Sequence, residues 1–431
     1  MSATAAGRLR GHLAQPLFAG AYGLMASTVV TTVLGIGFWA VAARSSTPAE
    51  VGRDAVLITS MMTLSNVCQL NLFDGLVRFL PTVRPARRVR AVIGAYAAAG
   101  AAGLVGGALF VLGAPALSSE LDYLGSDAWL GVGFALATAG WSIFVLQDAA
   151  LTAVRRTWWL PVENAGFSIL KMLLLPVAAL AGLAHGIFAA WVVPLVVLLP
   201  VVNVLLVRRV LRPEAVLGAP PAAASRPQGR NLVGFLLEDY AGYVLGQAAV
   251  TVIPLVVLTQ LGSTQSGWFA IPFTLVVALD LLFYAVTTSM TVEGAHDHTQ
   301  VRALLRTVAR RFLVLLVPIA LLVVAAAPLL LAPFGSDYAD EGTTALRLLA
   351  CASVPHALVT LYTAVSRLRG RGRPILAAQA TLFALVVGLA LALAEPHGLP
   401  GVALAWLAGN VVVGLAVALP LVRAARAEPA A

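Results

Sequence analysis

The stretch FLVLLVPIALLVVAAAPLLLAP, residues 312–333, has no charged side chain over a length that can cross a bilayer as a helix. Apolar runs of similar length recur from residue 18 to residue 422, between short charged or Gly- and Pro-rich breaks. These runs lack the polar alternation of membrane β-barrel strands. Because only helices and closed barrels satisfy their backbone hydrogen bonds in lipid, the sequence predicts an all-α membrane protein.

The composition of the 431-residue chain agrees with this fold class. Charged residues make up 11% of the chain and hydrophobic residues 60%, and the mean hydropathy is +0.91. A soluble domain has about 25% charged residues. The net charge of +9 comes from arginines in short loops, so we expect no nucleic-acid partner. The two cysteines lie inside apolar runs without CxxC spacing and predict no metal site.

The apolar runs predict about twelve spanning helices. The first run is longer than the core of a signal peptide, so we expect it to remain as the first helix. The predicted helices are 18–43, 55–80, 90–112, 129–154, 159–183, 187–207, 232–259, 267–291, 312–333, 345–366, 374–394 and 400–422.

The placement of arginine indicates the orientation of these helices. Short cytoplasmic loops are enriched in Lys and Arg. The Arg-rich segments are 8–10, 84–90, 155–156, 208–230, 302–311, 367–373 and 423–426. They alternate with Arg-poor segments, except that the first of these holds Arg44 and Arg53. The pattern predicts a multi-pass protein of the bacterial inner membrane with both termini in the cytoplasm.

Short sequence matches repeat at one offset. The pair Asp122-Tyr123 recurs as Asp337-Tyr338, and HGIFAAW at 185–191 recurs as PGVALAW at 400–406, each 215 positions later (337 − 122 and 406 − 191). Gly52 and Gly267 repeat the offset. The sequence therefore predicts a duplication of six helices, which gives two parallel repeats with a substrate path where they meet. We expect an N-terminal lobe over 1–207, a cytoplasmic linker over 208–231 and a C-terminal lobe over 232–431.

Ionisable residues inside the predicted helices are candidates for function, because charge in the bilayer is costly. They include Asp74, Arg78, Asp148, Glu163, Lys171, Glu238, Asp239 and Asp280. The alternative is that each pairs with a neighbour or reaches an interface; Asp74 and Arg78, four residues apart, could simply pair.

Three of the ionisable residues, at two places in the chain, are predicted to couple transport to an ion. Asp280 is one of them, because it falls, as does Lys171, closest to mid-membrane, where reaching water is hardest. Glu238 and Asp239 are adjacent carboxylates, which repel unless one is protonated or a cation is shared. We therefore predict Asp280, Glu238 and Asp239 as ion-coupling residues.

No motif for catalysis or nucleotide binding is evident. The sequence has no Walker-type phosphate loop and no H-E-x-x-H, and its predicted loops are short. We expect a protein that is not an enzyme, needs no cofactor or metal, and draws on an ion gradient, membrane potential or substrate flux.

Several motifs carry a likeness to a known family. They are Phe38-Trp39, STPAEVG at 46–52, DGLVRFLP at 74–81, VEGAHD at 292–297 and FGSDYA at 334–339. With these motifs the chain resembles the polysaccharide flippases, also called lipopolysaccharide or oligosaccharide repeat-unit exporters, of the multidrug/oligosaccharidyl-lipid/polysaccharide (MOP) superfamily.

The resemblance implies two six-helix lobes that alternate between inward- and outward-open states. The implied substrate is an undecaprenyl-pyrophosphate-linked oligosaccharide, moved from the cytoplasmic to the outer leaflet for cell-surface polysaccharide synthesis. Arg78 matches the basic position of the family motif and suits a pyrophosphate. The predicted substrate path consists of Arg78, Asp74 and Lys171, of which Lys171 is assigned from its depth in the membrane and not from the motif. The implied partners are membrane lipids and other polysaccharide-assembly membrane proteins.

Two other functions are compatible with the sequence. A cation- or proton-coupled drug antiporter of the same superfamily, or a major-facilitator transporter, would also have twelve helices. A membrane enzyme such as a glycan polymerase would need a larger outer loop than the one near residues 114–128.

Overall fold

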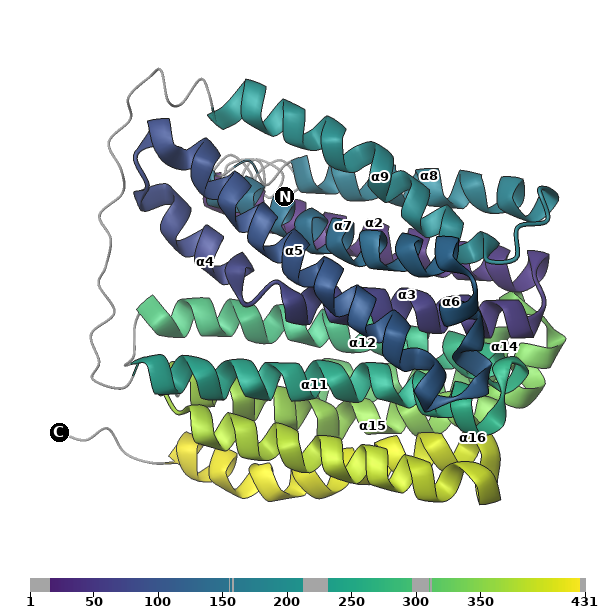
Figure 1. The fold of residues 1–431 in the computed structure, drawn as a ribbon. Helices are drawn as coiled ribbons and strands as arrows, with labels where there is room; N and C mark the ends of the chain where they lie inside the picture. Colours follow the sequence, from purple (N-terminus) through teal and green to yellow (C-terminus); the bar gives the residue numbers. More distant parts are fainter. Residues whose placement is uncertain are drawn as a thin grey trace, which may run out of the picture. The chain divides into compact units, whose positions relative to one another are not determined.

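The computed structural model describes residues 16–154, 156, 159–211, 232–296, 310 and 312–426 (Figure 1). The described residues form helices joined by short turns. The main helices are α2 (Pro16–Ser45), α3 (Pro48–Cys68), α4 (Leu72–Phe79), α5 (Pro85–Leu117), α6 (Asp122–Ser126), α7 (Ala128–Ala153), α8 (Trp159–Leu180), α9 (Gly186–Leu206), α11 (Leu232–Leu261), α12 (Ser263–His296), α14 (Val317–Leu331), α15 (Ser336–Leu368) and α16 (Gly372–Arg426). Single turns named η1, η2, η3, η5 and η6 cover Leu80–Thr82, Ser119–Leu121, Val207–Leu211, Phe312–Leu316 and Ala332–Phe334.

The predicted all-helical membrane fold is confirmed. Within the described ranges, eight helices are each long and apolar enough to cross a membrane, and α3 and α4 together form one further, bent span. The long helix α16 is divided by Gly398, whose φ of 60° and ψ of −144° are not helical, into the two spans predicted over 374–394 and 400–422. Helices therefore occupy all twelve predicted ranges, and one of these ranges contains a break.

The prediction of one unbroken helix over 55–80 is wrong. The span breaks between α3 and α4, whose axes differ by 51°. Leu70 and Asn71 at the break have φ of 52° and 59°, in a left-handed region that costs free energy for residues other than glycine. Periodicity does not reveal this break because both flanking segments remain apolar.

The family-like motif at residues 46–52 forms the start of α3. The Thr47 backbone N–H donates to Glu50 Oε2 at 2.8 Å, and the Glu50 N–H donates to Thr47 Oγ1 at 3.3 Å. This is a capping box, and Pro48 occupies the first helical position, where its missing N–H costs nothing. The motif therefore has a structural reason for these residue types.

The chain divides into two compact units. Unit 1 comprises residues 1–45, 64–115 and 122–226, and unit 2 comprises 46–63, 116–121 and 227–431. The units differ from the predicted lobes because the first part of α3 and the η2 segment group with the second half of the chain. Most of the predicted linker, residues 212–231, lies outside the described residues, as do Arg302, Arg306 and Asp297.

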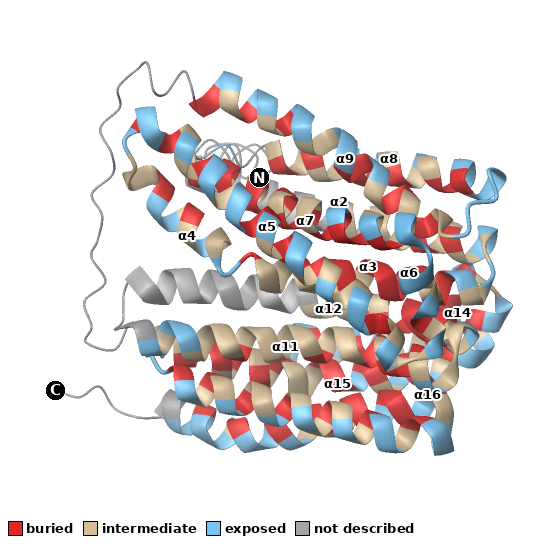
Figure 2. Ribbon diagram, viewed as in Figure 1, coloured by how far each residue is buried: buried red, intermediate tan, exposed pale blue. Residues whose placement is uncertain are grey.

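Each unit packs its helices through small or apolar faces. In unit 1, Leu76 and Leu80 of the α4 segment pack with Leu146 and Ala149 of α7 in one hydrophobic core. In unit 2, α15 packs against α12, α14 and α16, and α11 packs against α16 (Figure 1). Buried and exposed residues alternate at helical spacing along the helices that Figure 2 colours by burial, and many exposed ones are large and apolar, as lipid-facing side chains are.

The helix boundaries repeat at the offset found in the sequence. The helix α3 begins at residue 48 and α12 at residue 263, a difference of 215 (263 − 48). The helices α2 and α11 begin at 16 and 232, a difference of 216. One offset thus relates equivalent helices with shifts of few residues, as expected after a duplication.

Candidate functional site

A polar cluster lies inside unit 2 around Asp280 of α12. Ser353 and His356 of α15 approach the Asp280 carboxylate, His356 within electrostatic range. Ser353 Oγ is buried and completes no well-formed hydrogen bond with a described residue. His356 Nδ1 lies 2.9 Å from Oδ1 of Asn410, and the Asn410 amide donates to the Trp406 carbonyl at 2.8 Å. Three helices thus hold a carboxylate and an imidazole together.

The equivalent positions of unit 1 are not ionisable. Subtracting 215 from Asp280, Ser353 and His356 gives Ser65, Thr138 and Trp141. Ser65 Oγ donates to the Thr138 carbonyl at 2.8 Å, so the same helices meet in the same way. Asp280 and His356 therefore lie on a helical framework that unit 1 shares without these titratable side chains. This difference favours a function specific to unit 2.

Unit 1 instead encloses Lys171 of α8 in aromatic rings. Its Nζ lies 3.4 Å from the centroid of the Trp191 ring, 4.9 Å from that of Phe38 and 5.3 Å from that of Phe167. The side chain is 4% exposed. The rings offer their negative faces to the ammonium, which is the geometry of a cation–π cage. In this conformation Lys171 does not face solvent.

A second polar network in unit 1 joins α7, α8 and α9. The Gln147 amide donates to Glu163 Oε1, and the Asn203 amide donates to Gln147 Oε1 at 2.5 Å. Gln147 is fully buried and Glu163 is 6% exposed. Glu163 Oε2, Asp148 Oδ1 and Asn203 Oδ1 are buried oxygens without a hydrogen-bond partner among the described residues. Unsatisfied buried oxygens are costly, so this network suits a proton, water or cation.

Asp148 and Glu163 are recognisable from the sequence as submerged charges, but they are not among the predicted site residues. Their adjacency in sequence to neutral Gln147 and Asn164 carries no signal of a shared network. Gln147 and Asn203 are 56 positions apart, and only the packing of α7 against α9 brings them together. The one sequence signal for Gln147 and Asn203 is that each is a polar amide inside an apolar run.

Glu238 and Asp239 lie near the start of α11, and each has its own arginine. Arg367 Nε lies 2.8 Å from Asp239 Oδ1, and Arg373 Nε lies 3.2 Å from Glu238 Oε1. The two arginines supply the positive charge that adjacent carboxylates require. The ion pairs fasten α11 to the turn between α15 and α16.

Asp74 and Arg78 lie on one exposed face of α4. Leu76 and Leu80 of the same segment pack in the hydrophobic core, so the charged side chains lie away from it. Arg78 stacks against the Phe79 ring with its guanidinium carbon 5.5 Å from the centroid. The structure thus leaves the family-motif arginine accessible, whereas it encloses Lys171.

The described residues contain no group of three or more His, Cys, Asp or Glu side chains that could hold a metal ion. The carboxylates of the two polar clusters can bind a proton or a cation, and Arg78 can bind an anion.

The described residues define a class of fold: a polytopic helical membrane protein whose two halves share a helical framework, with a polar cluster inside each unit. Solved structures of other membrane proteins share this fold. The chain is similar to an inward-facing multidrug resistance MATE family transporter of the MOP superfamily, with a TM-score of 0.65 and 16% identity over 92% of this chain and 94% of the other.

Two further structures share the fold. The lipid II flippase MurJ in an inward closed conformation has a TM-score of 0.64 and 11% identity over 92% of this chain and 86% of that one. The Vibrio cholerae MATE transporter VcmN has a TM-score of 0.58 and 16% identity over 97% of this chain and 98% of that one. No family model and no curated protein matches the sequence. At these identities the likeness establishes the fold.

Proposed function

We propose that this protein transports a lipid-linked oligosaccharide, with an undecaprenyl-pyrophosphate carrier, from the cytoplasmic to the outer leaflet by alternating access. The observation that carries the proposal is the exposed Asp74 and Arg78 face on the broken span α3–α4. The motif that includes both residues resembles that of polysaccharide flippases, and a guanidinium matches the geometry of a phosphate. The fold shared with the lipid II flippase MurJ supports the proposal.

In this proposal Arg78 contacts the pyrophosphate. Asp74 orients the Arg78 guanidinium and balances its positive charge between transport cycles. Lys171 would reach a phosphate only if its ring cage opened, since its ammonium lies against Trp191. Asp280 is the proposed coupling residue, because the His356 imidazole lies within electrostatic range of its carboxylate. Glu238 and Asp239 could contribute to coupling only if their arginines moved away.

The test follows the glycan across the membrane. A deletion strain carries the wild-type gene, Arg78→Ala, Arg78→Lys or the control Arg156→Gln, which removes an exposed arginine from another turn of unit 1. A membrane-impermeant oxidant applied to spheroplasts reports how much lipid-linked glycan has reached the outer leaflet. We expect Arg78→Ala to strand the glycan inside, Arg78→Lys to restore part of the transport, and the control to resemble wild type. Normal surface glycan in the deletion strain would contradict the proposal.

A second candidate function is cation- or proton-coupled drug antiport. The observation that favours it is the pair of buried carboxylate clusters, at Asp280 and at Asp148 and Glu163, together with the fold shared with MATE transporters. Purified protein in vesicles would then expel a cationic dye when a proton or sodium gradient is imposed. Gradient-driven dye movement with an unaffected surface glycan would favour this function over the first.

A further inference from the structure

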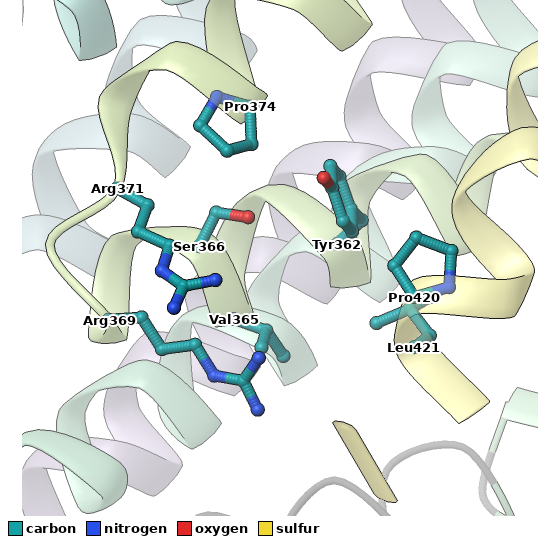
Figure 3. A pocket seen from close by; sticks show the side chains of 8 residues that line it. All are labelled: Tyr362, Val365, Ser366, Arg369, Arg371, Pro374, Pro420 and Leu421. Atoms are coloured by element: carbon teal, nitrogen blue, oxygen red, sulfur yellow. The ribbon is translucent and has the colours of Figure 1, made fainter. Parts of the chain in front are cut away.

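A pocket lies in unit 2 beside the turn between α15 and α16. It has a volume of about 70 Å³ and is lined by Tyr362, Val365, Ser366, Arg369, Arg371, Pro374, Pro420 and Leu421. Figure 3 shows the side chains of Arg369 and Arg371 extending on one side of the pocket, with Tyr362, Pro420 and Leu421 on the other. Two guanidinium groups thus border a hollow whose remaining wall is largely apolar.

The arginines of this turn divide into two kinds. They occupy every second position from 367 to 373, and the outer two, Arg367 and Arg373, are paired with Asp239 and Glu238. Neither Arg369 nor Arg371 forms an ion pair with any residue that the structure describes. The nearby carboxylates are therefore already engaged, and the two inner arginines keep their positive charge for another anion.

The other half of the chain explains why a hollow exists here. Subtracting 215 from Ser366, Pro374 and Leu421 gives Leu151, Trp159 and Leu206, which pack together in the hydrophobic core of unit 1. In unit 2 a serine replaces a leucine and a proline replaces a tryptophan, so that volume is not filled. Arg369 stands where unit 1 has Val154, which packs against the same core. The second half has thus exchanged a packed core for a hollow bordered by positive charge.

From this geometry we propose that the pocket binds a phosphate group, as carried by the headgroup of an anionic phospholipid. Arg369 and Arg371 pair with the phosphate oxygens, Ser366 and Tyr362 offer hydroxyls, and Pro420 and Leu421 contact the glycerol and the first acyl carbons. The turn is on the side predicted to be cytoplasmic. This site is separate from the proposed transport path and concerns a resident lipid rather than the transported one.

The experiment titrates phosphatidylglycerol into full-length protein in neutral detergent and counts bound lipids by native mass spectrometry, with phosphatidylcholine as the neutral lipid. The double variant Arg369→Gln and Arg371→Gln removes the charges. The variant Ser366→Leu fills the hollow and keeps both arginines. The control Arg156→Gln removes the arginine that stands 215 positions before Arg371.

We expect wild type and the control to retain phosphatidylglycerol, and the double variant to bind it about thirtyfold more weakly, since each arginine near a membrane surface contributes about 1 kcal/mol. Ser366→Leu should weaken binding as well. If this variant bound phosphatidylglycerol as tightly as wild type, the lipid would be held by surface charge alone, and the proposed binding in the pocket would be wrong. Equal binding by wild type and the double variant would overturn the site. Size-exclusion profiles verify that each variant is folded.

A second arm distinguishes the source of the phosphate. Inorganic phosphate is added to the complex of wild type with phosphatidylglycerol. Displacement of the lipid supports recognition of the phosphate group alone, whereas retention supports a lipid ligand held also by its apolar part. Because the readout is binding, failure of this site leaves the proposed transport function unaffected.

Discussion

Gly52 and Gly267, which are 215 positions apart, meet where α3 crosses α12. A Cβ atom on Gly267 would lie 1.9 Å from the Pro48 carbonyl oxygen, and a Cβ on Gly52 would lie 2.3 Å from that of Ser263. Each glycine thus accepts the backbone at the start of the other helix. Equivalent residues of the duplication contact each other, which requires the two helices to be related by local two-fold symmetry at this crossing.

Gly267→Ala and Gly52→Ala should each destabilise the protein, because backbone atoms must move to admit a methyl group. We expect a loss of about 1–3 kcal/mol, which is typical of overpacking. Thermal unfolding in detergent, followed by size exclusion, measures the change. Gly166→Ala is the matched control, since nothing lies within 4 Å of its Cβ and alanine favours the helix. A control as unstable as Gly267→Ala would contradict the close crossing.

Lys171→Met should raise the melting temperature. Burying an ammonium costs several kcal/mol, whereas a desolvated cation–π contact returns about 2 kcal/mol. An apolar side chain of similar length removes the desolvation cost, which exceeds the cation–π stabilisation, and still fills the ring cage. If Lys171 also acts in transport, the variant will be stable but inactive. A lower melting temperature than wild type would show that the cage stabilises the charged form by more than its desolvation cost.

Asp280→Asn should abolish transport without loss of expression, because the amide keeps the size of the side chain but cannot hold a removable proton. His356→Gln should reduce transport while keeping a hydrogen bond to Asn410 possible. Glycan accessibility in the deletion strain measures both. The double variant Glu238→Gln and Asp239→Asn, measured alongside, tests the other predicted coupling residues. Full complementation by Asp280→Asn would remove Asp280 from the mechanism.

Gln147→Leu should cost about 1–3 kcal/mol, because it leaves Glu163 Oε1 without its buried donor. Adding Glu163→Leu should recover most of this loss, since an apolar pair leaves no unsatisfied group at the two positions. Thermal unfolding of the two single variants and the double variant gives the coupling free energy. Additive losses would indicate that the two side chains do not interact.

The sequence by itself determined the fold class, because uncharged runs of bilayer length leave a helix as the only way to satisfy the backbone. It also revealed the duplication, since the offset of 215 is a property of order along the chain and needs no contacts. The starts of α3 and α12 follow that offset.

Only the tertiary structure decided which charged residues lie together. Glu238 and Asp239 are repelling neighbours in sequence, and Arg367 and Arg373, more than a hundred positions away, are their partners. Gln147, Glu163 and Asn203 form a network only because three helices pack side by side. Helical periodicity specifies which face of a helix a residue occupies, but the identity of the neighbouring helix depends on packing between segments that are distant in sequence.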